Sequence, residues 1–151
     1  MAFVGKQFGA LQNLSDLNLS KNKIKEVDSD CLTELKGLVL LDLHQNQLTS
    51  FTSVPLSAKL DTLNLAFNFI TSIENLHNAP KLTVLDLHNN KLTEFPESIV
   101  DLKEIKTLRI SNNDLGDINP RISLLPNLVR INIEGNPLKC IKSSMRNANA
   151  D

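Results

Sequence analysis

A string of eleven residues, represented by Leu82 to Leu92, occurs six times along the chain and constrains the fold more than any other feature. In each copy, apolar residues alternate with other residues, an asparagine follows, and one more apolar residue comes two positions later. The asparagines are separated by 24, 22, 22, 23 and 23 residues. A nearly fixed period of this size indicates a stack of similar coils. The copies begin at Leu14, Leu38, Leu60, Leu82, Ile105 and Leu128.

Each string predicts a short strand with one buried face. Leu82, Leu85 and Leu87 point inward, and the residues between them point outward, because side chains alternate along a strand. The asparagine ends the strand and can hydrogen-bond backbone groups of the adjoining turns. We therefore expect the stacked asparagines to form a ladder. Loss of one amide, as in Asn90→Ala, is expected to cost about 1 to 3 kcal/mol.

The pattern L-x-x-L-x-L-x-x-N-x-L at this period resembles the leucine-rich repeat family. The resemblance implies a single domain over residues 1–151, an α/β repeat wound as a right-handed solenoid. About six parallel strands would form a concave sheet, and short helices or 3₁₀ turns would lie on the convex side. The resemblance implies no catalytic activity, so we expect no enzyme, no catalytic residue, no cofactor and no metal.

The segments that return from one strand to the next differ. After Asn90, the spacing of Phe95, Ile99 and Leu102 predicts a short helix with Pro96 near its first turn, and the fifth repeat copies it. The shorter third repeat predicts a 3₁₀-like turn. In the first repeat, Asp28 or Ser29 is a candidate N-cap for a helix through Cys31, Leu32 and Leu35. The second return segment, residues 51–59, is the least regular.

Both ends of the chain have the pattern of incomplete repeats. Val4, Phe8 and Leu11 repeat the spacing of the fourth return segment, so residues 1–13 are interpreted as a half-repeat. Ile141 and Met145 match the beginning of another return segment. A stack of repeats needs polar caps over its terminal apolar faces, and neither end is clearly one. The hypotheses are a fragment of a longer array or self-association through the ends.

Charge and cysteine content narrow the classes of partner and compartment. Sixteen basic and seventeen acidic residues give a net charge of -1, which argues against bulk attraction to nucleic acid or an anionic membrane. No apolar run is long enough to span a bilayer or to act as a secretion signal, which predicts a cytoplasmic protein. Cys31 and Cys140 lie five repeats apart, or roughly 24 Å, so free thiols are expected.

The C-terminal segment Gly135 to Lys142 sharpens the family resemblance. It begins like the disulfide-linked cap of secreted members but carries no further cysteine and no tryptophan. Together with residues 39–43, it resembles the C-terminal repeats of the intracellular leucine-rich repeat-containing protein 40 group.

The outward residues of the strands are the candidates for function, because they form rows across the concave face. Leu40, Phe67 and Val84 are apolar among polar neighbours, which is typical of a binding patch. Aspartates in the early repeats and arginines in the late ones could orient a partner. Covering of neighbouring strands and ordinary solvation are the alternatives. The predicted protein-binding residues are Leu40, Asp42, His44, Asn64, Phe67, Val84, Asp86, His88, Arg109 and Arg130.

A catalytic triad can be drawn from these rows, but we do not predict one. Asp42 with His44, and Asp86 with His88, lie one strand away from Ser20 or Ser111. No glycine-rich turn or helix terminus supplies an oxyanion hole. The two histidines are two strands apart, roughly 10 Å, and cannot share a metal ion.

The sequence thus favours a non-catalytic module or scaffold that binds another protein, of unknown identity, on its concave face. Two alternatives remain. The array could be a structural spacer within a larger repeat protein. It could instead contact RNA through basic residues near its C-terminal end, although the lack of an extended aromatic platform argues against nucleic acid. These basic residues are Arg121, Arg130, Lys139, Lys142 and Arg146.

Overall fold

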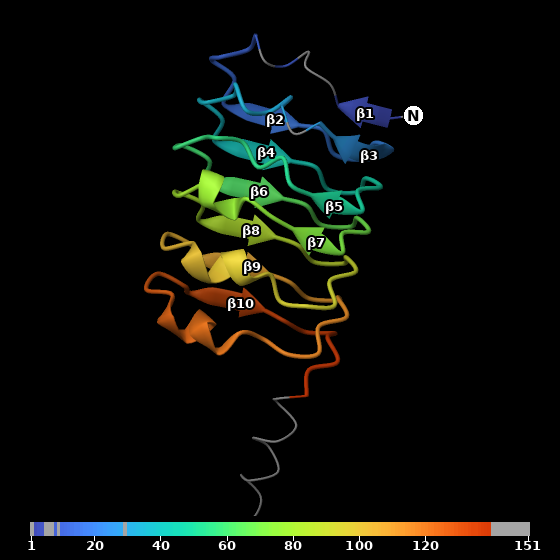
Figure 1. The fold of residues 1–151 in the computed structure, drawn as a ribbon, viewed down its shortest axis with the longest axis vertical. Helices are drawn as coiled ribbons and strands as arrows, with labels where there is room; N and C mark the ends of the chain where they lie inside the picture. The colour runs from blue at the N-terminus through green and yellow to red at the C-terminus, as the bar shows by residue number, and fades with distance from the viewer. Residues whose placement is uncertain (1, 5–7, 9, 29, 140–151) are drawn as a thin grey trace, which may run out of the picture.

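One short strand from each repeat enters a single parallel sheet (Figure 1). The structure is a computed structural model that describes residues 2–4, 8, 10–28 and 30–139. The central residues of the strands lie directly beside one another, so the repeats are stacked without a shift in register. The strands, in spatial order, are β2 (Asp16–Asn18), β4 (Leu40–Asp42), β6 (Thr62–Asn64), β8 (Val84–Asp86), β9 (Thr107–Arg109) and β10 (Arg130–Asn132).

Two further sheets of two strands each include the segments that follow the corner asparagines in the first three repeats. Strand β5 (Ser50–Phe51) pairs with β7 (Ser72–Ile73), and β3 (Ile24–Val27) pairs with β1 (Ala2–Val4). The register places Val4 opposite Val27. The backbone of β1 therefore lies where the post-corner segment of a preceding repeat would lie.

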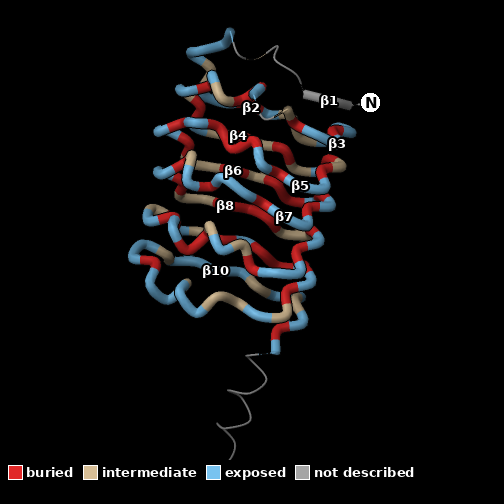
Figure 2. The backbone as a smooth tube through the Cα atoms, viewed as in Figure 1, coloured by how far each residue is buried: buried red, intermediate tan, exposed pale blue. Residues whose placement is uncertain are grey.

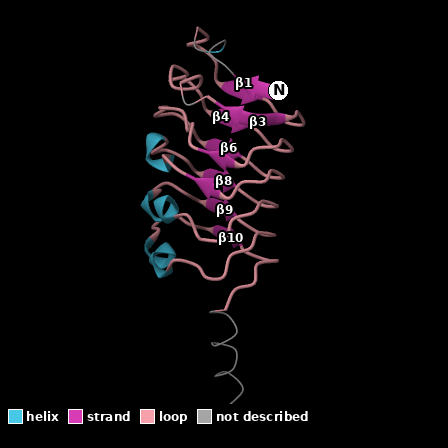
Figure 3. Ribbon diagram, turned by 45° about the vertical axis from the view of Figure 1, so that its right-hand side comes forward, coloured by secondary structure: helices cyan, strands magenta, loops and turns pink. Residues whose placement is uncertain are grey.

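The return segments of three repeats contain short 3₁₀ helices on the side away from the sheet (Figure 3). These helices are η2 (Leu76–Asn78), η3 (Glu97–Asp101) and η4 (Pro120–Leu124). The tight turn predicted for the third repeat and the short helices predicted after Pro96 and in the fifth repeat are confirmed. The second return segment has no helix, as its irregular sequence indicates.

The helix predicted for the first repeat is wrong. Residues 30–37 form separate turns, in which Cys31 N–H donates to the Asp28 carbonyl and Leu35 N–H donates to that of Leu32. Cys31, Leu32 and Leu35 are all fully buried. Separate turns bring the adjacent side chains of Cys31 and Leu32 into the core together, and this packing prevails over the local helical spacing.

The core runs through the stack between the sheet and the return segments (Figure 2). The predicted inward leucines of the middle repeats, such as Leu63, Leu85 and Leu87, have no exposed surface. At the N-terminal end, Phe8 and Leu14 pack against this core. The predicted fold class is therefore confirmed. Among the described residues, no helix is long and apolar enough to cross a membrane.

The corner asparagines form the predicted ladder. The Asn90 side chain donates to the carbonyls of Leu65 (3.0 Å) and Leu87 (3.1 Å), and its oxygen accepts from Ile70 N–H (2.9 Å). Asn46, Asn68, Asn113 and Asn136 make the same three kinds of contact. Each amide thus joins its own turn to the preceding repeat, so the corners, which lack ladder partners, have their backbone groups satisfied.

The cysteine prediction is tested at one position. Cys31 is a free, buried thiol. Burial, with a smaller contribution from the Asp28 carboxylate, raises its pKa to about 11. Cys140, Ile141, Lys142, Met145 and Arg146 lie outside the described residues.

Candidate functional site

The strand register aligns the outward residues across the concave face. One row contains Leu40 and Val84, with Thr62 between them. The next row contains Asp42, Asn64, Asp86 and Arg109, on four successive strands. Arg130 lies at the edge, on β10, and its side chain is exposed.

The apolar residues of the predicted site do not form one continuous patch on the strands. Leu40 and Val84 are half-buried and separated by Thr62, and Ala66 is buried. Phe67 lies beyond the end of its strand, and 44% of its surface is exposed. Phe69, on the other side of the corner, is 52% exposed. The apolar surface is therefore most exposed at the corner of the third repeat.

Two aspartates of the predicted site pair with basic side chains on the same face. Asp86 is buried, and its carboxylate contacts Arg109 Nη1 at 3.1 Å and His88 Nδ1 at 2.5 Å. Asp42 is half-buried, and its carboxylate contacts His44 Nδ1 at 2.8 Å. The ion pair of Asp86 and Arg109 across adjacent strands does not follow from alternation along one strand, and their role in orienting a partner stays a prediction.

The row of aspartates and asparagines has a structural role that the sequence analysis missed. The Asp42 and Asp86 side chains accept hydrogen bonds from the backbone N–H groups of His44 and His88. The same contact occurs in three other strings, where an asparagine side-chain oxygen accepts a hydrogen bond from the backbone N–H two residues later. These asparagines are Asn18, Asn64 and Asn132. These side chains cap the strand ends as Asx turns. The signal was available, since five of the six strings carry Asn or Asp at this position.

His88 and Phe67 connect the strand row to the corner. Their ring centroids are 4.7 Å apart and their planes are at 80°, an edge-to-face contact. His88 is also held by Asp86, which pairs with Arg109. The structure therefore brings four predicted site residues, Phe67, Asp86, His88 and Arg109, into one connected cluster.

The serines do not complete a triad in the part of the chain that the structure describes. Ser20 Oγ donates to Asn18 Oδ1 at 2.6 Å, and Ser111 is buried. His44 and His88 follow β4 and β8, which β6 separates. No group of three or more His, Cys, Asp or Glu residues that could hold a metal ion occurs among the described residues.

Open hollows also occur on the described part of the chain. One, of about 500 Å³, lies at the corner between the third, fourth and fifth repeats, where Phe67, Phe69, Asn89, Lys91 and Asn112 contribute to its lining. A second, of about 600 Å³, lies along β9 and β10.

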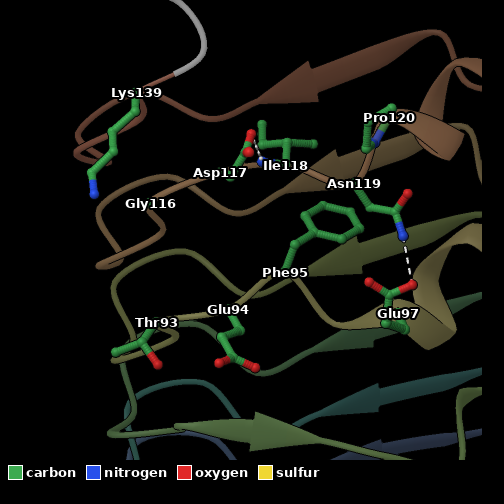
Figure 4. A pocket seen from close by; sticks show the side chains of 10 residues that line it. All are labelled: Thr93, Glu94, Phe95, Glu97, Gly116, Asp117, Ile118, Asn119, Pro120 and Lys139. Atoms are coloured by element: carbon green, nitrogen blue, oxygen red, sulfur yellow. Dashed lines mark hydrogen bonds between the residues drawn. The ribbon is translucent and has the colours of Figure 1, made fainter.

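The third hollow, of about 670 Å³, lies between the segments that lead to η3 and η4 (Figure 4). The Phe95 ring lies near its centre, and Asn119 points toward Glu97, to which its amide donates at 2.5 Å. This hollow belongs to the return side, away from the predicted site.

Comparison with known proteins agrees with the repeat architecture. The family described as "Leucine rich repeat" matches residues 4–48 and 80–138, and "Leucine Rich repeats (2 copies)" matches residues 58–100. The chain belongs to the leucine-rich repeat family. The closer resemblance to the protein 40 group stays a prediction.

Among individual relatives, the chain is 31% identical to keratocan of Bos taurus over 149 residues, which are 94% of this chain and 42% of keratocan. The chain spans less than half of the length of the curated relatives it matches. The leucine-rich repeat domain of APL1B superposes with a TM-score of 0.77 at 22% identity, covering 89% of this chain and 39% of the other.

A solved complex shows the same fold in an assembly. The chain superposes on a structure described as an octameric complex of Latrophilin 3, Unc5D and FLRT2 (leucine-rich repeats), with a TM-score of 0.71 at 21% identity, covering 90% of this chain and 51% of the other. Leucine-rich repeat domains bind other proteins, and this complex is an example.

Proposed function

We propose that the concave face binds another protein and performs no chemistry. The observation that carries the proposal is Phe67, a 44% exposed aromatic side chain at the edge of the sheet. Its ring lies against His88, which Asp86 holds in turn. Phenylalanine is among the residues that are enriched in the buried centre of protein interfaces. A partner would extend from this edge over Thr62, Leu40 and Val84.

The rigidity of the scaffold supports the same function. Residue-for-residue strand pairing and the asparagine ladder fix the concave side chains relative to one another. A surface that is already ordered loses little conformational entropy on binding. A cytoplasmic location, expected from the sequence, is part of this proposal and is tested by fractionation of the source cells.

Crosslinking and affinity capture from the source cells tests the proposal. The wild-type chain is compared with Leu40→Arg/Phe67→Asn, which alters the concave face, and with Leu56→Arg, which alters a 53% exposed residue of the second return segment. We expect the wild type and Leu56→Arg to capture the same proteins and the double variant to lose them. Thermal unfolding of all three shows that each is folded.

The two alternatives give different results in the same experiment. If all three chains capture the same proteins, the concave face is idle and the spacer function is favoured. If capture is lost on nuclease treatment and falls steeply with salt, contact with RNA is favoured instead. One of the basic residues named for RNA, Arg121, lies 3.6 Å from Asp101 in an exposed ion pair.

A further inference from the structure

The corner of the third repeat differs from the corners of all other repeats. There, Phe67 and Phe69 flank the ladder residue Asn68, and both rings are exposed. The ladder residue itself is buried and bonded like its equivalents. The flanking residues of the other corners are Lys21 and Lys23, Gln45 and Gln47, Asn89 and Lys91, Asn112 and Asp114, and Gly135 and Pro137.

The backbone of the corner disfavours a phenylalanine. Phe67 has a φ of 54°, in the left-handed region, and the equivalent residue of every other repeat has a φ between 52° and 72°. This region suits glycine and asparagine, which occupy it in the last three repeats, and is an outlier for a bulky side chain. Neither folding nor the ladder therefore requires an aromatic ring at position 67.

The corner hollow joins the two rings to polar groups of the following repeats. Phe67 and Phe69 contribute apolar walls, and Lys91 and Asn112 contribute an ammonium group and an amide. Lys91 is exposed and has no ion-pair partner among the described residues. The hollow, of about 500 Å³, is within the size range of pockets that bind ligands.

Charge is distributed unevenly on either side of the aromatic pair. Toward the N-terminal end, the first corner carries Lys21 and Lys23, both exposed and without an ion-pair partner among the described residues. That corner is two repeats, or about 10 Å, from Phe67, a distance that three or four residues of extended chain can span. Toward the C-terminal end, the fifth corner carries Asp114. Along the row of corners, as distinct from the strand row with Asp42 and Asp86, the positive charge thus lies on the side of the early repeats.

From these observations we propose that the corner hollow docks an acidic, extended segment of a partner protein through one large apolar side chain. That side chain packs between Phe67 and Phe69. A neighbouring carboxylate pairs with Lys91, and further acidic residues extend toward Lys21 and Lys23, away from Asp114. The inference deepens the proposed function, because the hollow forms the edge of the concave face.

A displayed library of random twelve-residue peptides, selected on the purified chain, provides the probes. We expect enriched peptides to carry a large apolar residue next to several aspartates or glutamates. Their affinity is then measured by fluorescence anisotropy at low and high salt, and it is expected to fall as salt rises. Failure to enrich any peptide, or enrichment of peptides without acidic residues, overturns the proposal.

Single variants locate the binding site of the selected peptides. Phe67→Asn, Phe69→Ser and Lys91→Glu should each weaken binding about tenfold or more, as expected for central contacts. The matched control, Leu56→Ser, removes an equally exposed apolar residue elsewhere and should bind within about twofold of the wild type. Because asparagine suits the left-handed turn, Phe67→Asn should also raise the unfolding temperature, which separates lost binding from lost folding.

Leu40→Arg distinguishes this inference from the broader proposal. Loss of peptide binding in Leu40→Arg, but not in the three corner variants, places the peptide on the concave strands: the corner proposal fails and the proposed function stands. Unchanged binding in all four variants overturns the corner proposal, whereas the capture experiment with Leu40→Arg/Phe67→Asn decides the proposed function separately.

Discussion

The fourth and sixth repeats have the same sequence pattern but different degrees of burial. In β8, the central residue Leu85 has no exposed surface, and Asp86 is buried beside it. In β10, all three residues are exposed, and Ile131, the equivalent of Leu85, is 41% exposed. Val129, in the same string, and Leu124, in the return segment before it, are exposed still further, at 78% and 70%.

The sequence pattern therefore determines which residues of a coil face inward. Whether these residues are buried depends on the presence of neighbouring coils on both sides. Leu85 is covered by coils on both sides, because β8 lies between β6 and β9. Ile131 has a described neighbour on one side only, β9. The N-terminal end is different again, since Phe8 and Leu14 pack over it and leave Leu17 only 6% exposed.

The largest test of this comparison is a pair of core truncations. Leu85→Ala should lower the free energy of unfolding by about 2 to 5 kcal/mol, because it leaves a cavity in the middle of the stack. Ile131→Ala should cost no more than about 1 kcal/mol, because much of its surface is already in water. Urea denaturation measures both.

If Leu85→Ala and Ile131→Ala lower the free energy of unfolding equally, Ile131 is not exposed in solution. The predicted self-association through the ends would then be favoured, and the loss for Ile131→Ala should depend on protein concentration. A concentration-independent difference between the two variants supports the comparison as the structure describes it.

The asparagine ladder gives the second test, because its members also differ in burial. Asn90→Ala should cost about 1 to 3 kcal/mol, since it leaves the Ile70 N–H and two carbonyls unpaired within the buried corner. Asn22 is exposed, and within the described residues its amide donates to carbonyls of its own turn, those of Leu19 and Ser20. Water can replace those bonds, so Asn22→Ala should cost less than about 0.5 kcal/mol. Comparable losses at the two positions would show that the interrepeat bonds are not the stabilising ones.

The repeat period explains why much of the fold could be predicted from the sequence. Inward leucines and corner asparagines recur at fixed spacing, so strand order, register and the ladder follow from one copy. The turns of Cys31 to Leu35 could not be predicted, because three apolar residues at helical spacing are also compatible with separate turns. The Asp86–Arg109 pair links residues 23 positions apart, and its strength depends on burial that no local pattern encodes.

The candidate site was predicted less completely for a related reason. Outward residues were assigned by alternation alone, which does not distinguish a capping carboxylate such as Asp42 from one that is free to bind. Alternation also treats Phe67 as a strand residue, whereas its backbone is in a left-handed turn. Recurrence across the six copies separates the two classes: shared residues such as Asn64 serve the coil, and the aromatic pair of the third corner is unique to one repeat.

The buried thiol tests how tightly the first repeat is closed, in contrast to the exposed last repeat. The raised pKa of Cys31, about 11 against 9.0 for a free thiol, means that the folded state favours the neutral form. Ionisation of Cys31 therefore has no effect on stability below about pH 9 and lowers stability as the pH rises from 9 toward 11. In a Cys140→Ser background, labelling of Cys31 at pH 8 should proceed only through opening of the coil. Labelling as fast as in denaturant would contradict this closed arrangement.

The smallest expected difference concerns two arginine ion pairs, one central and one near the last coil. Arg109 contacts the buried Asp86 at 3.1 Å, whereas Arg121 and Asp101 are both more than half exposed and 3.6 Å apart. Arg109→Gln should cost about 1 kcal/mol, since Asp86 loses a charged partner in a partly dry site while His88 still contacts it. Arg121→Gln should change stability by less than about 0.5 kcal/mol, because solvent screens an exposed pair. High salt should reduce the Arg109→Gln loss only in part, because Asp86 is buried although the Arg109 side chain is about half exposed. If high salt abolishes the stability losses of both Arg109→Gln and Arg121→Gln, the central repeats do not protect their charges from screening better than the terminal ones. The two regions then differ only in the burial of apolar residues.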